Sequence, residues 1–232
     1  MRFAKPLVAL IALGSLTAST VMDPYNPTCP VDPGWGDAAE MELQAADVGG
    51  KRVLIANGII DETLPERLKE ALDEDEMISE VWLQSRGGHA RAGNEAGRII
   101  RSFRGMTTRI PTGWTCFSAC NFIFMGGDRR VVEAGGVFMV HMFTHTSDRW
   151  VIKEAVLEGT GATTELIADI EQQSALLASE DNDFLIRMGV SRKLLTDVMY
   201  RQQAVESEGN PSTRYCLSRD EVVEYNVMNF GA

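Results

Sequence analysis

Histidine, cysteine and basic residues are all scarce in this chain of 232 residues. Only three histidines are present and the four cysteines form no CxxC pair, so the sequence offers no ligand spacing typical of a zinc site. Lysine and arginine number 22 against 33 acidic residues, which gives a net charge of -11. This charge argues against nucleic acid or anionic membranes as partners. The basic stretches "RSFR" and "GDRR" are expected to be solvated surface arginines.

Long apolar runs are equally rare, and the one that exists stands at the N-terminus. There "MRFAK" carries two positive charges, "PLVALIALGSL" is apolar, and "LTA" supplies small residues before a cleavage point after Ala18. This three-part pattern predicts that residues 1–20 are a signal peptide, with an uncleaved N-terminal anchor as the alternative. We therefore expect an exported protein, periplasmic or extracellular, with no further membrane span.

Low-complexity tracts, long internal repeats and phosphate-binding glycine loops are absent. Hydrophobic residues make up 44% of the chain and charged residues 24%, as in an ordinary soluble globular protein. The length without the signal fits one domain with a sizeable core. We expect no metal, nucleotide or organic cofactor.

The even number of cysteines in an exported chain indicates disulfide bonds, with three possible pairings. One bond could tie Cys29, in the N-terminal loop, to Cys216, near the C-terminus. Cys116 and Cys120 are expected to bond either to each other or separately to those two. A bond between residues four apart is awkward inside a regular helix, so mutual pairing requires Cys116 to precede the helix.

Strand and helix patterns alternate along most of the chain, which indicates an α/β fold. Residues 21–50, which include the proline-rich stretch "MDPYNPTCPVDPGWG", are predicted to be an extended segment before a domain at 51–232. Strand patterns at 51–60, 78–85 and 106–113 are separated by helical ones. The stretch from Cys116 to Gly127 is expected to form a buried helix. The apolar stripe at 166–186 is expected to be part of the core or of a subunit interface.

One apolar stretch, "GWTCFSACNFIFMGGDRRVVEAGGVFMVHMF" (113–143), holds the candidate chemistry. A serine hydroxyl is a poor nucleophile until a base takes its proton. The position of His141 after Ser118 in the chain makes it the best candidate for this base. His145, nearer the loop edge, is a backup base. The structural alternative is that Ser118 is a small residue of a buried helix and that His141 is a core histidine with its hydrogen bonds satisfied.

Four ordered motifs resemble the Clp-protease/crotonase superfamily over roughly residues 51–230. "QSRGGHARAG" resembles the glycine turn of Clp proteolytic subunits, and a serine at a helix start follows it. "RRVVEAGGVFMVH" resembles the segment that delivers the Clp histidine, and "CLSRDEVVEYNVM" resembles the family's C-terminal ending. The resemblance implies stacked ββα turns in a small superhelix with outer helices, and assembly into homo-oligomers.

The resemblance also implies roles for particular residues. Ser118 would be the nucleophile and His141 its base, and the backbone N–H groups of Gly88 and Ala119 would hold the oxyanion. Gly87 and His89, in the glycine turn, would line the substrate groove, although a solvated His89 is the alternative.

The third member of a catalytic triad is left open by the sequence. The family's aspartate position falls on Asn210, with Glu208 two residues earlier; either could orient the imidazole. A Ser–His dyad, an impaired site and a Ser–Lys arrangement with Lys153 are the alternatives.

These residues predict an exported serine hydrolase, in particular a peptidase that acts on peptide or protein substrates through an acyl-enzyme. The alternative from another class is a non-catalytic peptide-binding or scaffold protein on the same fold. A crotonase-like acyl-CoA enzyme ranks last, because coenzyme A is scarce outside the cytoplasm.

Overall fold

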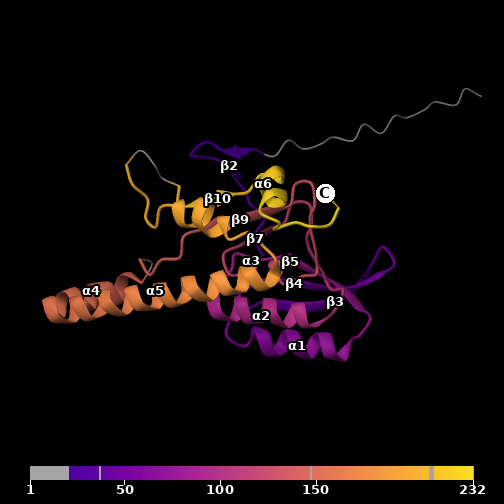
Figure 1. Ribbon diagram of the computed structural model, residues 1–232, viewed down its shortest axis with the longest axis horizontal. Helices are drawn as coiled ribbons and strands as arrows, with labels where there is room; N and C mark the ends of the chain where they lie inside the picture. Colours follow the sequence, from indigo (N-terminus) through magenta and orange to yellow (C-terminus); the bar gives the residue numbers. More distant parts are fainter. Residues whose placement is uncertain (1–20, 37, 147, 209–211, 232) are drawn as a thin grey trace, which may run out of the picture.

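The computed structural model describes residues 21–36, 38–146, 148–208 and 212–231. The predicted signal peptide, residues 1–20, lies outside these ranges. The described chain is α/β, as the alternation of patterns predicted (Figure 1).

The central element is a five-stranded sheet with the strand order β3-β4-β5-β6-β8. Its strands are β3 (Glu42–Val48), β4 (Lys51–Asn57), β5 (Ile78–Gln84), β6 (Thr107–Ile110) and β8 (Arg129–Val132). All neighbouring strands are parallel except the β3–β4 pair. Parallel neighbours need crossover connections, and three helices lie in them: α1 (Leu64–Glu74), α2 (Ala90–Ser102) and α3 (Cys120–Met125).

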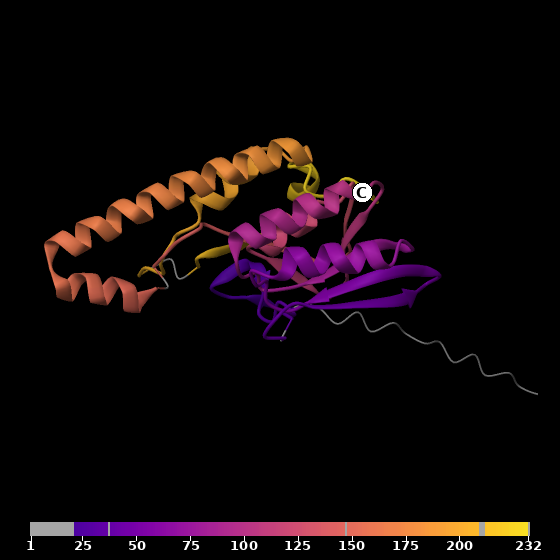
Figure 2. The same ribbon diagram turned by 90° about the horizontal axis from the view of Figure 1, so that it is seen from below.

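Helical periodicity explains how these helices cover the sheet. Leu64, Leu68 and Leu72 recur every four residues along α1, and all three are buried. The helix α2 lies between α1 and the C-terminal half of the long helix α5 (Thr160–Met188), as Figure 2 shows. The helices α1 and α2 follow β4 and β5, so their packing on the sheet positions the loops at the C-terminal ends of these strands.

A second sheet of three strands supplies the candidate site. It has the order β10-β9-β7, with β7 (Thr115–Phe117), β9 (Val137–His141) and β10 (Arg214–Cys216). The strands β7 and β9 are parallel, whereas β9 and β10 are antiparallel. A bridge between Ser85 and Cys116 joins the end of β5 to β7, so the two sheets meet beside the glycine turn.

Strand pairing also includes residues before position 51, the predicted start of the domain. Residues 42–48 form β3, which pairs with β4 through a hairpin at Gly49 and Gly50, both with positive φ. The segment before it is also partly ordered as strands, because β1 (Met22–Asp23) and β2 (Asn26–Pro30) pair with each other. The sequence pattern did not reveal β3 as a strand, because it lies at the edge of the sheet and most of its side chains face solvent.

A pair of helices projects from the body of the molecule as an arm (Figure 2). It consists of α4 (Arg149–Glu158) and the N-terminal half of α5. No residue of α4 is buried, whereas the buried residues of α5 begin at Leu177. The apolar stripe expected at 166–186 is therefore core only in its second half. None of the described helices, α5 included, combines the length and apolarity that crossing a membrane requires.

The C-terminal end is anchored by Arg130, which corrects the expectation of a solvated surface arginine. Arg130 is 1% exposed, and its guanidinium donates to the backbone carbonyls of Val227, Asn226, Gly127 and Met188. Burial lowers its pKa to about 10. The chain reaches this anchor through a π-helical turn η1 (Leu194–Val198), a 3-10 turn η2 (Met199–Arg201), β10 and α6 (Arg219–Glu224).

Two disulfide bonds settle the pairing that the sequence left open. Cys29 bonds to Cys216 and so ties β2 to β10, while Cys116 bonds to Cys120. As that second bond requires, Cys116 lies before α3, in the strand β7. The Cys29–Cys216 bond is buried against Phe117 and Met139, which belong to β7 and β9.

Candidate active site

Ser118 occupies a strained turn between β7 and α3. The helix predicted for this stretch begins at Cys120, so Ser118 precedes it instead of lying within it. Its φ is 58°, a left-handed conformation that is uncommon for any residue other than glycine. The Cys116–Cys120 disulfide closes the chain around this turn. Backbone strain of this kind is concentrated at functional sites, where the surrounding structure holds it in place.

His141 ends β9 and directs its ring toward the serine. The His141 Nε2 atom lies 2.7 Å from the Ser118 Oγ atom, within hydrogen-bond distance. The ring is half-buried and packs on Phe117, with 4.7 Å between ring centroids. Burial lowers the pKa of His141 below its ordinary value, and a hydrogen bond to the Met142 backbone opposes this shift. The imidazole is therefore neutral at neutral pH, the state in which it can accept a proton.

The glycine turn after β5 lies directly against Ser118. Gly87 and Gly88 have φ values of 90° and 145°, which side chains other than glycine rarely adopt. A β-carbon on Gly87 would lie 2.6 Å from the Ser118 Cβ atom, and one on Gly88 would lie 2.1 Å from the Ile60 carbonyl oxygen. Within the described residues, no hydrogen bond uses the backbone N–H of Gly88 or Ala119. Two free donors thus accompany the serine.

Replacing Gly87 with alanine is expected to slow any reaction of Ser118 about 100-fold, because the added methyl group displaces the serine and a shift of about 1 Å can cost that much. The rate of labelling by a fluorophosphonate, beside thermal unfolding, measures this effect. Gly105→Ala is the matched control, since Gly105 also has a positive φ of 78° but has no atom within 4 Å of the added carbon. Equal labelling rates of the two variants would contradict the expectation.

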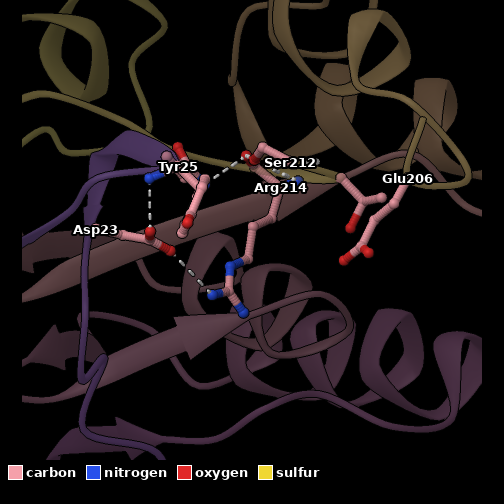
Figure 3. A pocket seen from close by; sticks show the side chains of 7 residues that line it. Asp23, Tyr25, Glu206, Ser212 and Arg214 are labelled. Atoms are coloured by element: carbon pink, nitrogen blue, oxygen red, sulfur yellow. Dashed lines mark hydrogen bonds and ion pairs between the residues drawn. The ribbon is translucent and has the colours of Figure 1, made fainter. Parts of the chain in front are cut away.

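Of the two residues expected at the third position of a triad, only Glu208 lies within the described chain. Asn210 lies outside the described residues, and Glu208 is exposed. The residue of β10 that stands opposite His141 is Arg214. Figure 3 shows that Arg214 points to Asp23, with which it forms an ion pair at 3.8 Å. Burial lowers the pKa of His141 against the opposing effect of the Met142 backbone, and no carboxylate of the described chain contributes to the shift.

The remaining candidates lie away from the serine. Lys153 is exposed on α4. His89 caps α2 by accepting a hydrogen bond from the Ala92 N–H, and it lines a neighbouring pocket together with His145. The Ser118 pocket itself is lined by neither of these two histidines. Across the described residues, no group of three histidine, cysteine, aspartate or glutamate side chains could hold a metal ion.

An acidic residue that the sequence did not single out belongs to this site. The pocket that contains Ser118 and His141 is walled by Phe122, Leu177, Met199 and Tyr200 and also contains Asp181. Asp181 lies on α5, in a stretch whose helical periodicity is that of an ordinary amphipathic helix. Its position in the sequence carries no signal, because only the packing of α5 against α2 and α3 brings it into the pocket of the serine.

Comparison with known proteins places the fold. No family model matches the sequence, and no curated protein is similar to it. Among solved structures, a mutant of ClpP1 from Listeria monocytogenes superposes with a TM-score of 0.50 and 16% identity, over 75% of this chain and 87% of that one. ClpP1 from the same organism gives a TM-score of 0.49, 17% identity and the same coverage.

A third similar structure is a mutant of a membrane-bound stomatin-specific protease, with a TM-score of 0.46, 11% identity and 74% of each chain covered. At these identities the likeness concerns the fold alone, and the ClpP1 mutant carries it. The chain therefore has the Clp-protease-type fold that its sequence motifs resemble.

Proposed function

We propose that this chain is a serine hydrolase, in particular a peptidase that acts through an acyl-enzyme. The observation that carries the proposal is the 2.7 Å separation between Ser118 Oγ and the Nε2 atom of a half-buried, neutral His141. A nucleophile within hydrogen-bond reach of a base, beside free backbone donors, is the arrangement that acyl transfer needs. The protease-type fold supports the same reaction class.

The proposed peptide hydrolysis uses two side chains and two backbone N–H groups. Ser118 Oγ attacks the carbonyl carbon of a peptide bond as its proton passes to His141 Nε2, and the N–H groups of Gly88 and Ala119 stabilise the oxyanion. Collapse of this intermediate breaks the C–N bond, the leaving amine takes the proton from His141, and an ester on Ser118 remains. Water then attacks the ester, with His141 again as base, and the acid product leaves.

We propose that the Met142 backbone, whose hydrogen bonding raises the pKa of His141 against the effect of burial, orients the imidazole where a triad would use a carboxylate. A neutral carbonyl stabilises the imidazolium less than an aspartate does, so we propose a Ser–His dyad that is slower than a full triad.

The non-catalytic alternative rests on the lack of a carboxylate partner for His141 among the described residues. A site with no described carboxylate on His141 would also fit a peptide-binding protein that kept the fold and lost the chemistry. The strained Ser118 turn and the unused N–H groups favour the enzyme, because peptide binding alone requires neither of them.

We further propose that the protein is exported and forms homo-oligomers. The two disulfide bonds fit an oxidising compartment. The arm of α4 and α5 exposes Trp150, Leu157 and Ile167, a concentration of apolar side chains that suits contact with a second copy of the chain. Light scattering of the purified protein tests the oligomer, and a monomer at micromolar concentration would refute it.

Fluorophosphonate labelling tests the proposed enzyme, because such probes react with activated serines. The protein should be labelled, and Ser118→Ala and His141→Ala should each abolish or strongly reduce the labelling. His145→Ala is the matched control: it removes a histidine from the neighbouring pocket and should leave labelling unchanged. Absence of labelling in folded, disulfide-intact protein would favour the binding protein instead.

A further inference from the structure

Asp181 is a buried acid without a described partner. Asp181 is 5% exposed, and its Oδ1 atom is buried with no hydrogen-bond partner among the described residues. Burying a carboxyl group in this way is costly, and most buried polar groups are satisfied. An unsatisfied one that lines a pocket can accept a hydrogen bond from a ligand that enters the pocket and supplies a donor.

The surroundings of Asp181 define what such a ligand looks like. It lines the small pocket of Ser118 and His141, of about 30 Å³, and it also lines an adjoining pocket of about 380 Å³, so a long side chain can use both spaces. The walls between the serine and the carboxyl group are mainly apolar, from Phe122, Leu177 and Met199. A matching side chain therefore has an apolar stem and a donor at its tip.

Asp181 is the acidic residue among those that line this pocket. Its neighbour Glu180 is exposed and pairs with Arg91 of α2 at 3.6 Å. No described arginine or lysine pairs with Asp181. Among the described residues that line this pocket, His141 and Tyr200 are the other titratable groups, and burial together with the Asp181 charge raises the pKa of the half-buried Tyr200 to about 12.

We infer that Asp181 is the specificity-determining residue of the proposed peptidase, which selects a basic side chain, lysine or arginine, in the residue before the scissile bond. The inference rests on the proposed function, since it assigns the Ser118 pocket to that side chain. The methylene stem packs on the apolar walls while the cationic head donates to the Asp181 carboxylate. Burial raises the Asp181 pKa to about 7, and a bound cation would restore the ionised form.

Hydrolysis of three peptide coumarin amides tests this specificity. The substrates are acetyl-Ala-Ala-Xaa-aminomethylcoumarin with lysine, norleucine or glutamate as Xaa, where norleucine keeps the stem and removes the charge. We expect kcat/KM for lysine to exceed that for norleucine on the order of 100-fold, as for a desolvated charge pair. In Asp181→Asn the ratio should fall to about 1, because the amide keeps the shape and loses the charge.

Asp183→Asn is the matched control for this substitution. It makes the same chemical change two residues along α5, at an exposed carboxylate that pairs with Arg98 and Arg187. This variant should keep the wild-type preference for lysine. A wild-type enzyme that cleaves the norleucine and lysine substrates equally well would overturn the inference.

Binding to an inactive variant separates this inference from the proposed reaction. Isothermal titration of acetyl-Ala-Ala-Xaa-Ala-Ala-amide peptides into Ser118→Ala should show the lysine peptide bound at least about tenfold more tightly than the norleucine peptide. The preference should vanish in Ser118→Ala/Asp181→Asn. Equal affinities, or no binding of either peptide, overturn the inference. Failed fluorophosphonate labelling of the wild type would refute only the hydrolase, because that probe carries no side chain for the Asp181 pocket.

Discussion

Replacing His141 with alanine is expected to slow the reaction of Ser118 with a fluorophosphonate about 10²- to 10⁴-fold, the usual contribution of a general base. The serine would keep its turn and the Gly88 and Ala119 donors but would lose the acceptor 2.7 Å from its Oγ atom. Second-order labelling rate constants of wild type and variant measure the effect. A loss of less than threefold would mean that the imidazole is no base for Ser118.

The pH dependence of the same rate gives an independent check. The base must be neutral to accept the serine proton, so the rate should rise with pH and fall as His141 becomes protonated. Because burial lowers the pKa of His141, half of the maximal rate should be reached below pH 6.5, the ordinary histidine value. His145→Ala should leave this profile unchanged, and a midpoint well above pH 6.5 would contradict the burial that lowers the pKa.

Removing the Cys29–Cys216 disulfide is expected to lower the free energy of unfolding by about 5 kcal/mol, the chain-entropy value for a bond that spans 187 residues. The bond closes nearly the whole domain, and both cysteines are buried, at 0% and 5% exposure. Alanine at both positions avoids free thiols. Guanidinium unfolding monitored by circular dichroism, without reductant, measures the difference.

The Cys116–Cys120 bond provides the internal comparison. It joins residues only four apart, for which the same model gives about 2 kcal/mol. Replacement of both of these cysteines by alanine should therefore destabilise the protein less, yet it should slow labelling more, since this bond holds the Ser118 turn. Equal losses of stability in the two double variants would contradict the chain-entropy account.

The sequence predicts the parts of this fold that repeat a regular pattern. The strands β4 and β5 and the helices α1, α2 and α5 follow from apolar periodicity, and the order of the motifs pointed to Ser118 and His141. The strand β3 escaped prediction because it is an edge strand whose exposed polar residues resemble a loop. Gly49 and Gly50, which make its hairpin turn, were the available signal.

Tertiary packing determines what the sequence could not show. Four cysteines permit three pairings, and only the approach of β2 to β10 selects Cys29 for Cys216. Asp181 enters the site because α5 packs against α2 and α3, a contact between segments far apart in the chain. The β10 register places Arg214 opposite His141, and no spacing between motifs specifies that register.

The most direct test of the central claim is peptide mapping by mass spectrometry after fluorophosphonate treatment of the folded, disulfide-intact protein. The serine hydrolase account predicts one adduct per chain, on Ser118, which is lost on prior denaturation and in His141→Ala. An unmodified protein, or an adduct on another serine with Ser118 free, would contradict the account and leave a peptide-binding protein as the better description of this fold.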